Sequence, residues 1–159
     1  MKRLLTAILF LALGTNITFA QSYDRGMDAK IDKDFALALR NFRPLAKRGH
    51  ADAQEQMGYL YKFGNGVLKD NKEAFKWFKK AARQGVSQVP MGLSYWYGEG
   101  VKQDYIKAHM WLNIASAKGH PNAGEYRNDV ELSMTQSDIS RATNMARECM
   151  ASDYKKCGY

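Results

Sequence analysis

Three histidines, His50, His109 and His120, are the side chains in this sequence best suited to metal binding or proton transfer. A metal site needs ligands at spacings such as His-x-x-x-His or a Cys/His cluster, and no such spacing occurs. His50 and His120 also hold the same place in two copies of an internal repeat, described below. We therefore expect turn and surface roles for all three histidines, and no metal.

Two Gly-x-Gly segments, at 64–66 and 98–100, have the form of a phosphate-binding loop. Such a loop needs a strand-turn-helix frame and usually a Gly-Lys-Ser/Thr ending, which this sequence lacks, so we expect both segments to terminate helices. The serines have no Gly-x-Ser-x-Gly context, and the carboxylates of Asp70 and Glu73 are explained by helix capping. The sequence therefore predicts no catalytic residues, no cofactor and no enzyme.

The two cysteines, Cys149 and Cys157, lie close together near the end of the chain. An even number of cysteines in an exported protein indicates a disulfide. We expect these two to form one bond that holds the tail over the exposed end of the fold. Two free thiols are the alternative.

Export is indicated by residues 1–20, which have the layout of a secretory signal peptide. Lys2 and Arg3 give a positive start, 4–13 is an uninterrupted apolar run, and small residues precede a cleavage point after Ala20. The apolar run is shorter than the roughly 20 residues that span a bilayer, which argues against a membrane anchor. We expect a periplasmic or secreted protein with no integral membrane segment in the mature chain.

The positive net charge of the chain indicates what kind of partner it could bind. Loss of Lys2 and Arg3 with the signal peptide lowers the formal net charge of +8 by two. A positive balance suits an acidic protein partner or an anionic surface. Nucleic acid is not expected, because an exported protein rarely meets it.

The middle of the chain repeats itself with an offset of 34 residues. The segment 61–67 matches 95–101, and the same offset relates Asp70 to Asp104, Trp77 to Trp111 and Gly85 to Gly119, among others. A partial copy lies upstream at an offset of 36 residues, and a fourth copy begins at Gly119 and fades. Fading is expected at the ends of a repeat array, where terminal units must face water.

Each unit reads as two helices. In the first helix, Ala53, Met57 and Tyr61 share one apolar face. Asp70 is the predicted N-cap of the second helix, and Glu73 is predicted to complete a capping box. Neither helix can bury its apolar stripe alone, so stacking is required. The expected helices are 22–31, 34–48, 51–62, 71–84, 89–97, 105–118, 122–132 and 136–152.

These motifs together resemble the Sel1-like repeat family, and the resemblance covers nearly all of 22–152. The matching residues are Ala-x-x-x-Met-Gly-x-x-Tyr at 53–61, Gly-x-Gly-Val at 64–67, Asp70, Ala-x-x-Trp at 74–77 and Ala-Ala-x-x-Gly at 81–85. Tetratricopeptide repeats are the second choice, because they lack the Gly-x-Gly-Val loop and the Asp that follows it. The resemblance implies an all-α fold, a right-handed α-solenoid of antiparallel helix pairs.

The resemblance also implies a scaffold or adaptor for other proteins. We therefore expect a monomeric, non-enzymatic protein–protein interaction module, an adaptor, scaffold or regulator. An inhibitor or immunity-type protein that masks a partner enzyme is a narrower alternative. A hydrolase or a β-lactam-like small-molecule binder is the alternative of a different class. It is disfavoured because family members linked to β-lactams carry a Cys pair in each repeat, unlike this chain.

The predicted organisation is a signal peptide over 1–20 followed by a single domain over 21–159. That domain comprises a partial repeat at 21–49, full repeats at 50–85 and 86–119, and capping helices with the disulfide at 120–159. The third unit has two residues fewer than the second before its helix glycine, and Pro90 lies in the shortened start. Since proline is tolerated in the first turn of a helix, that helix is expected to begin near Val89.

Two surfaces are candidate partner sites. The first is the concave groove lined by the first helix of each pair, the face that such solenoids use for recognition. Its predicted residues are Tyr59, Lys62, Phe63, Leu93, Trp96 and Tyr97. The alternative is that several of these pack against the neighbouring repeat.

The second surface is a basic ridge on the second helices, formed by residues related by the offset of 36. Its predicted residues are Arg40, Arg43, Lys47, Lys76, Lys79 and Arg83. In the next copy these positions hold Met110, Asn113 and Ala117, so the ridge is expected to stop there, with the last helix covering that patch. A solvated outer face is the alternative to a docking strip for an acidic partner or anionic lipid.

Overall fold

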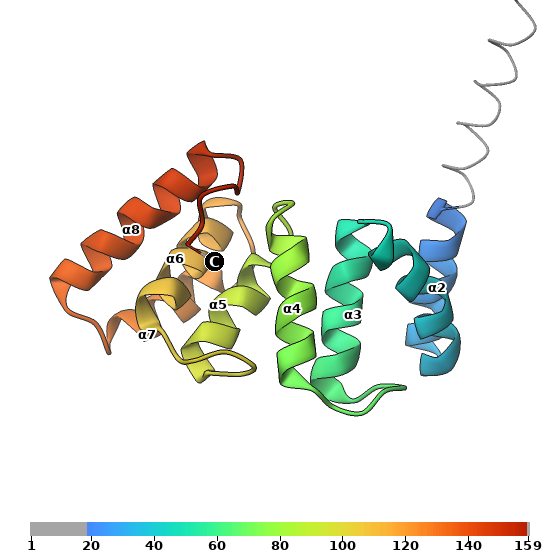
Figure 1. The fold of residues 1–159 in the computed structure, drawn as a ribbon. Helices are drawn as coiled ribbons and strands as arrows, with labels where there is room; N and C mark the ends of the chain where they lie inside the picture. Colours follow the sequence, from blue (N-terminus) through green and yellow to red (C-terminus); the bar gives the residue numbers. More distant parts are fainter. Residues whose placement is uncertain (1–18, 159) are drawn as a thin grey trace, which may run out of the picture.

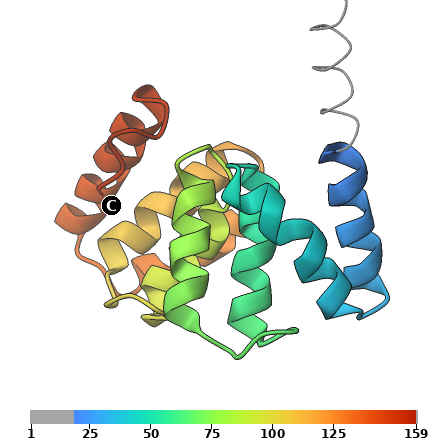
Figure 2. The same cartoon turned by 45° about the vertical axis from the view of Figure 1, so that its right-hand side comes forward.

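The computed structural model describes residues 19–158, which form a row of helices packed side by side. Figures 1 and 2 show the helices following one another from the first at one end to α8 at the other. Their bounds are 19–31 for the first helix, then α2 Phe35–Lys47, α3 Ala51–Phe63, α4 Asn71–Ala82, α5 Gln88–Tyr97, α6 Tyr105–Ala117, α7 Ala123–Glu131 and α8 Gln136–Ala151. The described chain is thus all-α, as predicted.

The predicted signal peptide falls almost wholly outside the described residues. Within residues 19–158, none of the helices is long and apolar enough to cross a membrane.

The second helix of each pair begins at an aspartate that accepts a backbone N–H. Asp34, Asp70 and Asp104 are the N-caps of α2, α4 and α6, and each carboxylate accepts from the N–H three residues on, at 3.0 Å. The prediction that Glu73 completes a capping box is wrong. Its carboxylate accepts from Lys76, and the N–H of Asp70 donates to the carbonyl of Tyr61 instead.

The shortened start of the third repeat changes how α5 begins. Pro90 lies in the first turn of α5, which begins at Gln88, one residue before the predicted start. Ser87, at the N-cap, has a left-handed φ of 63° and makes no capping bond. Its hydroxyl donates to Glu55 of α3 instead. The shortened start of α5 therefore makes a contact with the preceding repeat.

Two apolar clusters hold the row together. The first joins the helix over 19–31 with α2, α3 and Trp77 of α4. The second joins α4 with α5 to α8 around α6. As expected, α8 packs against α6, and Met110 is fully buried. The neighbouring Ala117 of the predicted patch remains exposed.

The predicted disulfide joins Cys149 of α8 to Cys157, with the Cα atoms 4.5 Å apart. Both cysteines belong to the second core cluster. The tail does not cover the exposed end of the row as predicted. Instead, Tyr154 lies beside Gly85, and the ammonium of Lys118 is 5.1 Å from its ring centroid. The tail therefore folds back over the turns that follow α4 and α6.

Candidate functional site

The first helices of successive pairs touch one another through their side chains. The ammonium of Lys30 donates to Gln56 at 2.6 Å, which joins the helix over 19–31 to α3. The Ser87 hydroxyl donates to Glu55, which joins α3 to the start of α5. Trp96 of α5 lies 6.4 Å from Tyr126 of α7, centroid to centroid. We call the continuous surface made by these four helices the first-helix surface.

Tyr59 is a half-buried member of this surface, anchored in the core. Its ring meets Phe78 edge-on at 5.2 Å and stacks on Phe63 at 6.2 Å, centroid to centroid. Burial, and secondarily the charge of Glu55, raises the pKa of Tyr59 to about 12. Tyr59 is therefore a neutral hydrogen-bond donor at physiological pH, and its ring packs against Phe78 and Phe63.

Trp96 is also half-buried, and its indole stacks on Tyr97 with the ring centroids 4.8 Å apart. Leu93 is half-buried as well. Lys62 is held in an ion pair, because its ammonium donates to Glu99 at 2.6 Å and so ties α3 to the loop after α5. Packing against neighbours thus accounts for part of the predicted groove set.

Phe63 and Tyr97 are the two predicted residues that lie most open to a partner. They end α3 and α5, and their exposed fractions are 61% and 59%. Sequence reasoning missed two more exposed apolar residues at corresponding ends. Ile31 ends the helix over 19–31 and is 74% exposed, and Leu132 caps α7 and is 87% exposed. The spacing of 32 to 35 residues between these four positions could have been read from the sequence.

The basic ridge lies mostly in solvent: of its six residues only Lys79 is half-buried. Lys76 forms an exposed ion pair with Glu73. The ridge positions on α6 are held by Met110, Asn113 and Ala117, none of which is charged. Burial, and then the charges of Arg83 and of Lys107 on α6, lowers the pKa of Lys79. Lys107 sits one turn before the predicted Met110 position, so it extends the cationic surface onto α6.

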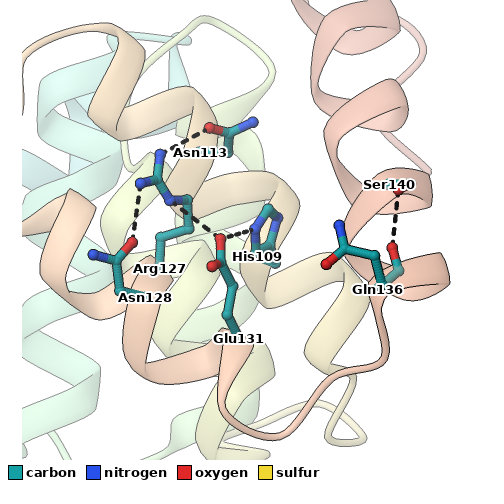
Figure 3. Close-up of polar contacts among 7 residues, drawn as sticks. All are labelled: His109, Asn113, Arg127, Asn128, Glu131, Gln136 and Ser140. Atoms are coloured by element: carbon teal, nitrogen blue, oxygen red, sulfur yellow. Dashed lines mark hydrogen bonds and ion pairs between the residues drawn. The ribbon is translucent and has the colours of Figure 1, made fainter.

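His109 is the histidine whose place the sequence predicted wrongly. It is 1% exposed in α6, and its Nε2 lies 2.8 Å from the Glu131 carboxylate of α7. Arg127 lies 3.5 Å from the same carboxylate and also donates to Asn113 of α6 (Figure 3). The imidazole is buried because α7 and α8 cover α6, so this network fastens α7 to α6.

The described side chains form exposed surfaces and no cluster suited to metal binding. Residues 19–158 contain no group of three His, Cys, Asp or Glu side chains that could hold a metal ion. The His109–Glu131 pair lies outside five hollows on this part of the chain. The accessible features of this part of the chain include the exposed apolar residues at the helix ends and the basic surface.

Comparison with known proteins agrees with this arrangement. The model of the Sel1 repeat matches residues 11–50, 51–86 and 87–120. A solved structure with 28% sequence identity superimposes with a TM-score of 0.79 over 86% of this chain. It is a protective antigen of uropathogenic Escherichia coli strains that displays an SLR (Sel1-like repeat) fold. This chain spans 31% of that antigen's length. Among curated proteins, none matches the chain.

Sel1 repeat proteins act in protein–protein interaction, and no catalytic family is indicated for this sequence. The three matched segments cover most of the chain and correspond to the helix pairs that end with α2, α4 and α6. The chain belongs to the Sel1 repeat family.

Proposed function

We propose that this protein is a non-enzymatic adaptor, scaffold or regulator that binds a partner protein across its first-helix surface. The partner contacts Phe63 and Tyr97 directly, with Ile31 and Leu132 extending the contact along the row. Tyr59 and Trp96 act as half-buried supports beneath the exposed rings. Lys62 and Leu93 contribute at the edge of the same surface.

The observation that carries this proposal is the recurrence of exposed apolar residues at the same end of four successive first helices. Single exposed apolar residues are ordinary on a protein surface. Four at the ends of successive first helices are not required by the core, since none of them belongs to either apolar cluster. Aromatic residues are the types that most often anchor interfaces, and two of the four are aromatic.

We place this activity in the periplasm or outside the cell. The Cys149–Cys157 disulfide supports this, because disulfides persist in oxidising compartments. The layout of residues 1–20 supports it as well, through its likeness to a secretory signal.

The test is affinity capture with the tagged protein from periplasmic extract, comparing wild type with the double variant Phe63→Ala, Tyr97→Ala. If these rings anchor the partner, the double variant loses at least about 2 kcal/mol of binding free energy, measured by calorimetry with the captured partner. These two residues are better probes than Tyr59 and Trp96, whose rings also stabilise the fold.

Met150→Ala is the matched control, because Met150 is a partly exposed apolar residue on α8, away from the first helices. Circular dichroism checks that all variants keep their helical content. Equal binding by wild type and the double variant would place the partner on another surface. If the captured partner is an enzyme whose activity falls on binding, the protein is an inhibitor of the immunity type.

A further inference from the structure

Two equivalent hollows recur where one repeat meets the next. The first is lined by α2 and by Gly66 of the following loop, and it includes Leu39 and Arg43. The second is lined by α4, the loop after α5 and the start of α6. The offset of 36 residues relates Leu39 to Phe75 and Arg43 to Lys79. Each hollow thus has an apolar residue and a cationic residue at the same two positions.

The same loop glycine closes each junction. A Cβ on Gly66 would lie 2.9 Å from atoms of Phe35 and Leu39 on α2. A Cβ on Gly100, the equivalent residue, would overlap the backbone of Asn71 at the start of α4. The Gly-x-Gly-Val loop therefore packs on the preceding second helix in both repeats, and this contact fixes the shape of both hollows.

Positive charge collects at these hollows. Arg40 and Arg43 line the first, and Lys79, Lys102 and Lys107 line the second. In the part of the chain that the structure describes, no ion pair involves Arg40, Arg43, Lys102 or Lys107. The second hollow contains one carboxylate, Asp104, which already caps α6. Burial, and then the charges of Arg83 and Lys107, lowers the pKa of Lys79.

The third junction is different because the chain fills it. The offset of 34 places His109 at the position of Phe75 and Asn113 at that of Lys79. Glu131 binds His109, and Arg127 binds Asn113, so the charges of α7 pair with each other there (Figure 3). At the two earlier junctions, no ion pair among the described residues ties Arg40, Arg43 or Lys102 to the next first helix.

We propose that the two open hollows bind carboxylate side chains on an acidic segment of the partner protein, one hollow per repeat. This rests on the proposed function and names the chemistry of the partner. Cations set one repeat apart match separate single charges along a peptide better than one compact phosphate. They lie in recesses between a helix and a loop, which a peptide side chain enters and a flat anionic bilayer does not.

The test uses a fluorescein-labelled hexaglutamate peptide and fluorescence anisotropy at low ionic strength. Arg43→Gln combined with Lys79→Gln removes the equivalent cation from each hollow. We expect the double variant to bind at least about five-fold more weakly, as two partly screened charge pairs would give. Added salt should weaken wild-type binding and reduce the difference between the proteins.

Lys155→Gln combined with Lys156→Gln is the control, because it removes the same charge from the exposed tail. If both double variants lose affinity equally, only net charge matters and the proposal is overturned. It is also overturned if hexaglutamate does not bind. A third contrary outcome is that binding of inorganic phosphate or phosphatidylglycerol vesicles depends on Arg43 and Lys79, whereas binding of hexaglutamate does not depend on them. Hexaglutamate has no apolar side chains, so its binding is unaffected by Phe63→Ala, Tyr97→Ala, and the two proposals fail separately.

Discussion

The second and third repeats, α3–α4 and α5–α6, carry the same motif and yet meet different surroundings. α4 buries one stripe of alanines and aromatic residues and shows lysines on its other side. α6 is buried on nearly all sides, including at His109 and Met110. The N-cap aspartates, the terminating glycines and the core tryptophans correspond one to one.

The difference lies at the positions that the motif leaves free. In α4 these positions are exposed, as at Lys76, or half-buried, as at Phe75 and Lys79. In α6 they are covered by α7 and α8. The motif therefore determines the helix pair and its stacking, whereas the remaining residues determine whether a repeat presents a binding surface or lies inside the fold.

The equivalent tryptophans give the largest expected contrast. Trp111 is 1% exposed at the centre of the second cluster, and Trp111→Ala should cost about 3–5 kcal/mol of unfolding free energy. Trp77 lies at the edge, with the Lys80 ammonium 4.3 Å from its ring centroid. Trp77→Ala should therefore cost less. Urea denaturation followed by circular dichroism measures both, and an equal loss would show that the two repeats are equally buried.

The cover over α6 can be loosened through the disulfide. Replacing Cys149 and Cys157 by Ala should cost roughly 2–3 kcal/mol of unfolding free energy, because the bond closes a short loop in the unfolded chain. Hydrogen exchange should accelerate mainly in α8 and α6, and little in α3. Reduction of the wild-type protein should reproduce this pattern. Uniform acceleration along the chain would mean that the cover does not distinguish the third repeat.

The residue at the position of the buried His109 can be exchanged between the two repeats. His109→Phe gives α6 the residue that α4 has at the equivalent position, Phe75. We expect a loss of about 1–2 kcal/mol of unfolding free energy, because Glu131 loses a hydrogen-bond partner and α7 is held less firmly. Phe75→His should leave an imidazole without such a carboxylate. A neutral or stabilising His109→Phe would show that packing, not the polar network, attaches α7.

Tyr59 gives the smallest expected difference in stability between the two repeats, and this difference appears only at high pH. Leu93 replaces it in the third repeat. The pKa of Tyr59 is raised from 10.0 to about 12, chiefly by burial. Between these pH values the unfolded chain releases a proton that the folded chain retains, so stability should fall as the pH rises above 10. Tyr59→Phe should reduce this fall when the free energy of unfolding is measured across that pH range. If the slope of stability against pH is unchanged, other groups cause the fall.

Much of the fold could be predicted from the sequence, because repeat residues report on local requirements. Asp70 and Asp104 precede helices whose first N–H groups need an acceptor, and Gly64 and Gly98 adopt the left-handed conformation that ends a helix. The offset of 34 carried each assignment from one repeat to the next. The helix bounds followed to within one or two residues for α2 to α8.

The candidate sites could be predicted only in part. The spacing of Phe63 and Tyr97 identified exposed ends, but the same spacing did not reveal that Tyr59 packs on Phe78. Lys62 pairs with Glu99, a contact across 37 residues that the spacing did not reveal either. Such pairings depend on how successive repeats are placed in space, and no local pattern encodes them.

The sequence by itself determined the helix pairs, their caps and their stacking, because backbone hydrogen bonding and apolar periodicity act within a single repeat. Only the tertiary structure decided which faces stay open. It buried His109 beneath α7, turned the tail back onto Gly85 and brought Lys107 and Lys79 to the same hollow. These outcomes depend on contacts between repeats and on the helices that end the row, where solvent exposure is a property of the whole assembly.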